Sequence, residues 1–155
     1  MGPAARPHAA HHRTEWPALA GPGPCTVYTR PVGEPDRLRL AREQLARVQT
    51  AWLDPVDWSD LSMYAFYALE NAVIAAADSF AIPWEKTHPS KVEVATELHA
   101  SKGLPDVSSL LEELNALRKS EAYGETPPAH GWGAEDLVIA VEEYVQAVAR
   151  LLGED

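Results

Sequence analysis

From residue 36 onward, apolar side chains recur at intervals of three and four along five separate stretches of the chain. The strongest of these stripes consists of Val107, Leu110, Leu111, Leu114 and Leu117. Because an α-helix turns once every 3.6 residues, this spacing gathers the apolar side chains on one face. We find no pair of alternating segments that would favour a sheet. The sequence therefore predicts an all-α protein.

Capping and breaking residues predict the limits of the first two helices. The first helix is expected to begin at Asp36 and to end at Pro55, because a proline restricts the residue before it to extended backbone. Ser59 or Asp60 is expected to cap the second helix, which runs to Pro83. This second stretch is hydrophobic on several sides. Such a helix belongs at the centre of a bundle or at a subunit interface.

The third and fourth helices have similar signals at their ends. The third is expected to begin near Pro89, since proline suits the first turn, and to stop at Gly103. Asp106 or Ser108 is expected to cap the fourth. A loop rich in proline and glycine then leads into a fifth helix over residues 134–152. Together these segments predict an antiparallel four- to five-helix bundle with an irregular N-terminal extension.

Residues 1–35 differ from the bundle in composition. They hold seven prolines and four glycines and have no periodic apolar face, so we expect a flexible Pro/Gly/His-rich tail ahead of a helical bundle at 36–152. The stretch CTVYT within this tail is expected to lie extended. His8, His11 and His12 can together wrap a metal ion, but we favour a solvated tail with no metal and no cofactor.

Charge and composition limit the classes of function. The chain has 155 residues, enough for one domain, and its 13 basic and 23 acidic residues give a net charge of -10. That charge argues against general coating of nucleic acid and leaves a small local RNA site or a basic partner protein. No apolar run approaches the roughly 20 residues that cross a bilayer. With no secretory signal and the single Cys25, we expect a cytoplasmic protein.

Glu70 lies within the apolar second stretch, one turn after Phe66 and one turn before Ile74. An unpaired carboxylate in a core costs several kcal/mol or holds a proton. A cation that meets it across the bundle would remove this cost, and Arg118 is a candidate. The other interpretation is that the helix is rotated so that Glu70 points to water, and the sequence leaves both open.

The peptide LRKSEAYGE places Arg118 near the end of the fourth helix and Tyr123 five residues later. Five residues correspond to nearly one and a half turns, so the two side chains share a face only if the helix ends between them. On spacing alone, we favour a structural interpretation. In it, Arg118 neutralises the helix C-terminus and Tyr123 packs its ring where the chain turns at Gly124.

Three motifs in order resemble the HEPN (higher eukaryotes and prokaryotes nucleotide-binding) family over residues 36–152. They are YAFYALENAVIAAADSFAI, then KTHPSK, then the leucine-rich stretch that closes with LRKSEAYGE. The family's second helix opens with aromatic and small residues followed by a glutamate, which matches Tyr67 to Glu70. A histidine near a helix start matches His88. The resemblance implies a small helical bundle that is often dimeric.

In the nuclease members of that family an arginine binds the scissile phosphate, and a histidine four to six residues later serves the ribose 2'-hydroxyl. The resemblance places Arg118 in the arginine position and Tyr123 in the histidine position. A phenol ionises near pH 10 and is a weak base at neutral pH, unlike imidazole. The candidate site of Arg118, Tyr123 and Glu70 is therefore expected to cleave RNA poorly.

Two classes of function follow from the resemblance. The favoured one is a HEPN-like protein that acts by dimerisation and partner binding, with a nucleotidyltransferase-like protein as one partner. The alternative is a metal-independent RNA endonuclease, the toxin of a toxin-antitoxin pair. A third interpretation is a bundle without a nucleotide connection, in which tryptophans cap the core. Motifs for phosphate loops, metal sites or serine nucleophiles are not found.

Overall fold

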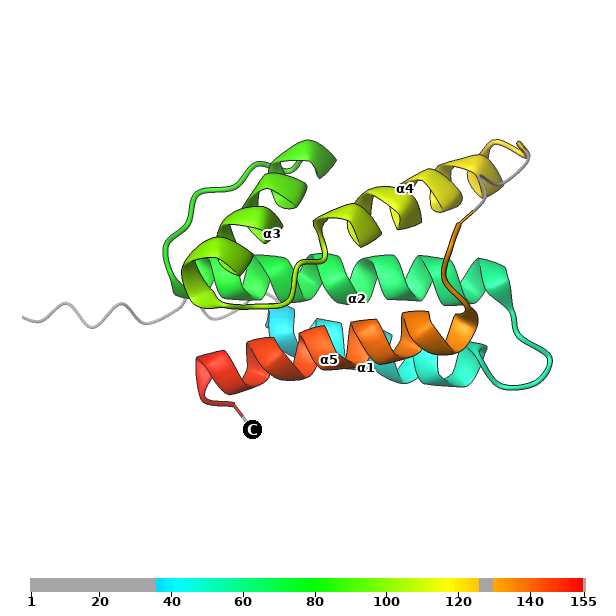
Figure 1. Cartoon of the computed structure of the whole chain (residues 1–155), viewed down its shortest axis with the longest axis horizontal. Coiled ribbons are helices and arrows are strands. Elements are labelled where there is room, and N and C mark those ends of the chain that lie inside the picture. The colour runs from blue at the N-terminus through cyan, green and yellow to red at the C-terminus, as the bar shows by residue number, and fades with distance from the viewer. Residues whose placement is uncertain (1–35, 126–129, 155) are drawn as a thin grey trace, which may run out of the picture. The chain divides into compact units, whose positions relative to one another are not determined.

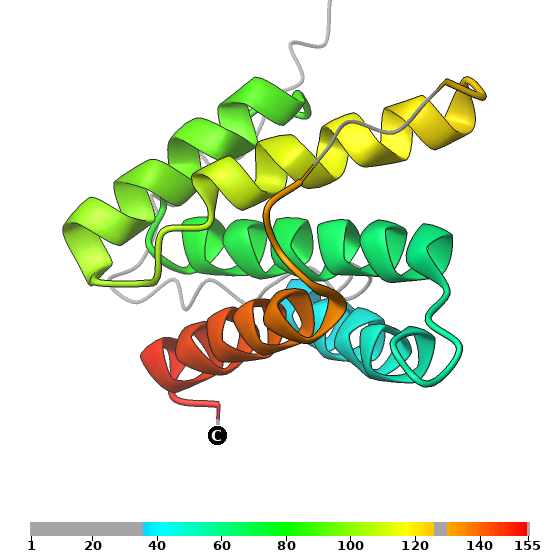
Figure 2. The same ribbon diagram turned by 45° about the vertical axis from the view of Figure 1, so that its right-hand side comes forward.

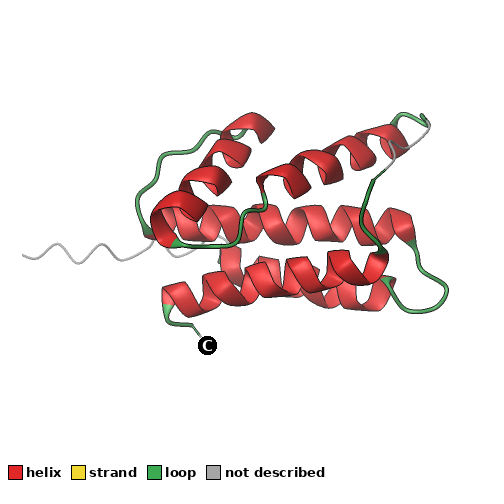
Figure 3. Ribbon diagram, in the orientation of Figure 1, coloured by secondary structure: helices red, strands yellow, loops and turns green. Residues whose placement is uncertain are grey.

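The computed structural model describes residues 36–125 and 130–154. The all-α prediction is confirmed, because this part of the chain forms helices joined by loops and contains no strand (Figure 3). The predictions for residues 1–35, including the tail, CTVYT and the three histidines, fall outside the described residues. The helices are α1 (Arg37–Ala51), α2 (Trp58–Ser79), α3 (His88–Lys102), α4 (Ser108–Ala122) and α5 (Ala134–Leu152).

Helix α2 lies at the centre of the bundle and contacts each of the other four helices. Helices α1 and α5 pack together on one side of it, and α3 and α4 on the other (Figures 1 and 2). The hydrophobic breadth of α2 is thereby covered within one chain. No helix of the part of the chain that the structure describes, α2 included, is long and apolar enough to cross a membrane.

The ends of α1 and α3 follow the local chemistry expected of them. The Asp36 carboxylate accepts hydrogen bonds from the backbone N–H groups of Leu38 and Arg39, which the first turn of a helix leaves without partners. Thr87 caps α3 in the same way. Gly103 ends α3 in the left-handed conformation, with φ of 71°. These caps satisfy backbone groups that the helix ends leave without partners.

The predicted caps of α2 and α4 were wrong in position. Asp57, rather than Ser59 or Asp60, caps α2, and its carboxylate accepts a hydrogen bond from the Asp60 backbone N–H. The Asp106 carboxylate accepts hydrogen bonds from the backbone N–H and the hydroxyl of Ser108, although neither residue occupies the cap position of α4. Short polar side chains near one helix start compete for the same free N–H groups, so sequence alone does not rank them.

Helix α2 ends at Ser79 instead of running to Pro83. Ala81 adopts a left-handed conformation with φ of 54°, and the Ile82 N–H donates to the Ala77 carbonyl over 2.9 Å. This hydrogen bond from beyond the helix back to its last turn is a common way to satisfy terminal carbonyls. The helix therefore stops one turn before the proline that was expected to end it.

The tryptophans divide into two pairs. Trp84 and Trp132 are partly buried and pack against the core, as the core-capping interpretation expects. Trp52 and Trp58 remain 36% and 41% exposed. Both lie near the connection between α1 and α2. Capping of the core therefore explains only half of the tryptophans that the structure describes.

Candidate functional site

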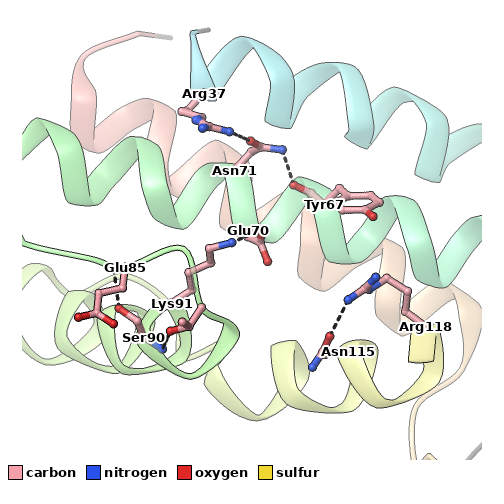
Figure 4. Close-up of polar contacts among 10 residues, drawn as sticks. Arg37, Tyr67, Glu70, Asn71, Glu85, Ser90, Lys91, Asn115 and Arg118 are labelled. Atoms are coloured by element: carbon pink, nitrogen blue, oxygen red, sulfur yellow. Dashed lines mark hydrogen bonds and ion pairs between the residues drawn. The ribbon is translucent and has the colours of Figure 1, made fainter. Parts of the chain in front are cut away.

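Arg118 is half-buried on the side of α4 that faces α2 (Figure 4). Its Nη2 donates a hydrogen bond of 3.0 Å to the side-chain oxygen of Asn115, one turn earlier on the same helix. Its guanidinium carbon lies 5.0 Å from the centre of the Phe66 ring, within the range of a cation–π contact. Its Nε is buried and has no hydrogen-bond partner among the described residues. Packing and one hydrogen bond thus hold the guanidinium against the bundle.

Phe66 joins three helices at this site. Its side chain is 3% exposed, and its ring centre lies 5.7 Å from that of His88 at the start of α3. The neighbouring Tyr67 ring meets it edge-on at 5.5 Å. Because Arg118 stacks on the same ring, α2, α3 and α4 meet at one aromatic side chain.

His88 is close to Arg118 only through this packing. Both of its ring nitrogens are buried and have no hydrogen-bond partner within residues 36–125 and 130–154. Burial lowers the pKa of His88 below its ordinary value, and although Glu70 opposes the shift, Lys119 adds to it. The imidazole is therefore neutral at neutral pH, in the form that can accept a proton.

Glu70 pairs with Lys91 rather than with Arg118, and its side chain is largely buried. The Lys91 Nζ on α3 lies 2.5 Å from its Oε1, and the two side chains are 13% and 17% exposed for Lys91 and Glu70 (Figure 4). The pair bridges α2 and α3. Arg118, the partner considered from the sequence, bonds to Asn115 instead. The neighbouring Asn71 accepts a hydrogen bond from Arg37 of α1, so it also faces a protein partner.

Tyr123 stands at the C-cap of α4 and is 76% exposed. Five helical residues place its direction about 140° around the axis from that of Arg118. The sequence interpretation in which its ring packs at the turn was wrong, because most of the ring is in solvent. The structure brings Arg118 and Glu70 to the same side of α2, but it does not place Tyr123 with them.

Sequence reasoning missed three residues of this site as partners of Arg118 and Glu70. Asn115 precedes Arg118 by three residues, so helical spacing alone predicts that the two share a face. Lys91 follows His88 by three residues, so the same spacing places Lys91 on the face of α3 that carries His88. The stacking of Phe66 on Arg118 had no comparable signal, because it joins residues far apart in the chain. Among the described residues, no group of three or more His, Cys, Asp or Glu side chains is placed to hold a metal ion.

Comparisons of the chain with protein-family models, curated proteins and solved structures found no match. The HEPN resemblance therefore rests on the three motifs in the sequence. It stays a prediction, and so do the functions that it implies.

Proposed function

We propose that this chain is a HEPN-like helical protein that acts mainly by dimerisation and partner binding and cleaves RNA weakly or not at all. One observation carries the proposal: Arg118 is stacked on Phe66 and bonded to Asn115, while Tyr123 projects into solvent in another direction. Strand cleavage at a ribose needs a phosphate clamp and a base on either side of one reacting group. The arginine and the tyrosine do not meet that requirement together.

A binding role is supported by the large apolar side chains that remain exposed. A group of such side chains on one part of the surface is a candidate site of macromolecular contact, whereas single scattered ones are not. Four of the six lie where α1 and α4 end and α2 begins, and the other two lie along α2 and α5. The six are Trp52, Leu53, Trp58, Tyr67, Tyr123 and Ile139. The resemblance names a second copy of the chain and a nucleotidyltransferase-like protein as partners of this class.

The second candidate function, a metal-independent RNA endonuclease, is favoured by the position of His88. Its neutral imidazole and the Arg118 guanidinium both pack on Phe66, so a base and a clamp share one aromatic ring. Its nitrogens are buried, and the first turn of α3 would have to move before either could reach a ribose. Because this movement of α3 costs free energy, binding is the better supported function.

Incubation of the purified full chain with single-stranded RNA and transfer RNA, without metal, should give little or no cleavage on a denaturing gel. Arg118→Ala and His88→Ala should leave this background unchanged, because neither side chain takes part in a formed catalytic site. Rapid cleavage that both substitutions abolish would establish the endonuclease instead. Tyr123→Phe serves as the matched control, since it removes only an exposed hydroxyl.

Light scattering should report a dimer at micromolar concentration. Because α2 is already covered by four helices, the dimer would use side chains that the bundle leaves exposed, such as Tyr67 or Ile139. Tyr67→Ser on α2 and Ile139→Ser on α5 test which exposed side chain the dimer needs. A mass of one chain over the whole concentration range would contradict this part of the proposal.

A further inference from the structure

Three aromatic rings from two distant segments lie together at one end of the bundle. The ring centre of Trp58, the first residue of α2, lies 5.3 Å from that of His130 and 6.2 Å from that of Trp132. His130 and Trp132 stack at 4.0 Å with an angle of 20° between their planes. The Trp132 indole N–H donates a hydrogen bond to the Glu113 carboxylate on α4. The rings are thus held before any ligand arrives.

Two of these rings, those of Trp58 and His130, line a small cavity, which we call the aromatic pocket. Its volume is about 200 Å³, and it is lined by Trp58, Ser62, Leu117, Glu121 and His130. Small-molecule and cofactor sites usually measure roughly 300–1,000 Å³. The aromatic pocket is smaller than that and suits a single side chain of a partner protein.

Glu121 supplies a fixed negative charge at the aromatic pocket. Its Oε2 accepts a hydrogen bond of 2.8 Å from the Ser59 hydroxyl, which joins the end of α4 to the start of α2. Its Oε1 accepts no hydrogen bond from any described residue. A cation that enters between the indole and the carboxylate would meet a π face on one side and a free oxygen on the other.

The surrounding chain segments are acidic. The C-terminal ends of α1 and α4 and the N-terminal ends of α2 and α5 lie at the same end of the bundle (Figure 1). Residues 52–60 carry three aspartates and no lysine or arginine, and residues 120–125 carry two glutamates next to the single basic residue of the last turn of α4, Lys119. The stretch 130–149 has no lysine or arginine either. The negative charge of these segments attracts a positively charged partner to this end of the bundle.

We propose that this end of the bundle docks a basic protein segment, and that one arginine or lysine side chain of that segment fills the aromatic pocket. The stem of the side chain packs on Trp58 and Leu117, and its cationic head pairs with Glu121. Arginine is the better fit, because its planar guanidinium stacks on indole and also binds a carboxylate. This inference rests on the proposed function, since it gives the chemistry and the place of the partner.

Charge selects this occupant over two others. A second copy of the chain would bring the same carboxylates against one another, which disfavours self-association through this end. RNA would bring phosphates to an acidic surface, and the repulsion would oppose its binding. A basic protein segment meets both the aromatic rings and the carboxylates.

The test is fluorescence anisotropy of dye-labelled peptides with the full chain at physiological ionic strength. The probes are a short peptide that alternates arginine with glycine, a lysine version and a serine version. Binding should be tightest for the arginine peptide and absent for the serine peptide. Trp58→Ala and Glu121→Gln should each raise the dissociation constant of the arginine peptide about tenfold. This is the change expected when one contact of a desolvated cation is lost. Glu121→Gln keeps an oxygen that can accept the Ser59 hydrogen bond.

Glu97→Gln is the matched control, because it removes the same charge from an exposed residue of α3 outside the aromatic pocket. It should change the affinity by less than about twofold, since a distant surface charge is screened by salt. Equal weakening by Glu97→Gln and Glu121→Gln would overturn the proposal and leave only general attraction to an acidic protein. If circular dichroism shows that the Trp58→Ala variant is unfolded, Trp58→Phe takes its place. Its affinity for the arginine peptide should be lower than that of the unchanged protein by less than tenfold.

Three further outcomes separate this inference from the proposed function. A single-stranded RNA that binds with Trp58 dependence would overturn the basic segment as occupant. If the protein is a dimer that does not cleave RNA and binds none of the three peptides, the proposed function stands and only the inference is overturned. Peptide binding by a protein that also cuts RNA efficiently would support the aromatic pocket and contradict the proposed function.

Discussion

Phe66→Ala should lower the free energy of unfolding by about 3–5 kcal/mol, the usual cost of emptying a buried aromatic site. The side chain is 3% exposed and supports both Arg118 and His88, so the cavity would open where three helices meet. Urea denaturation followed by circular dichroism measures the change. Phe66→Leu should cost only about 1–2 kcal/mol, because it keeps most of the apolar volume.

Tyr67→Ala is the control for this experiment. The residue is next to Phe66 in the chain but 37% exposed, so its removal should cost no more than about 1 kcal/mol. In folded Phe66→Ala protein the pKa of His88, which burial lowers, should rise towards its ordinary value in a proton NMR titration. Equal losses for Phe66→Ala and Tyr67→Ala would mean that Phe66 is not the packing centre of α2, α3 and α4.

Lys91→Met should lower the free energy of unfolding by about 1–3 kcal/mol. It leaves the Glu70 carboxylate without its cation where the side chain is only 17% exposed, and an unpaired charge at such a site costs more than the pair itself contributed. The double variant Lys91→Met/Glu70→Leu should recover most of the loss, since it removes both charges. Urea denaturation of the single and double variants gives the coupling energy.

Lys86→Met is the matched control, because this lysine is exposed in the loop before α3. It should change the free energy of unfolding by no more than about 0.5 kcal/mol. If Lys91→Met costs as little as Lys86→Met, the pair between α2 and α3 contributes nothing to stability, and Glu70 does not hold the two helices together.

Most of the fold could be predicted from periodicity and helix-breaking residues. The stripe from Val107 to Leu117 and the stop at Gly103 depend on local backbone rules, and the structure confirms both. The end of α2 could not be predicted, because Ala81 adopts a conformation that alanine rarely takes. Its local sequence contains no signal for a stop before Pro83.

The candidate site was less accessible to sequence reasoning than the fold. A partner for Glu70 was one of two interpretations that the sequence left open, and the choice between Arg118 and Lys91 depends on how α3 and α4 are rotated against α2. Rotation of a helix is set by packing across the whole interface, which no local pattern contains. The exposure of Tyr123 likewise follows from where α4 ends, and helix ends are the least certain feature of a sequence-based assignment.

The arrangement of helices around α2 has a consequence for how the molecule opens. Helices α3 and α4 contact α2 and each other but neither α1 nor α5. Transient separation of that pair would break the contacts around Phe66 and the hydrogen bond between Trp132 and Glu113 but leave α1 and α5 packed on α2, so its free energy is lower than that of global unfolding. Amide protons of α3 and α4 can then exchange with solvent through sub-global fluctuations, whereas those of α2 exchange only when both halves come apart.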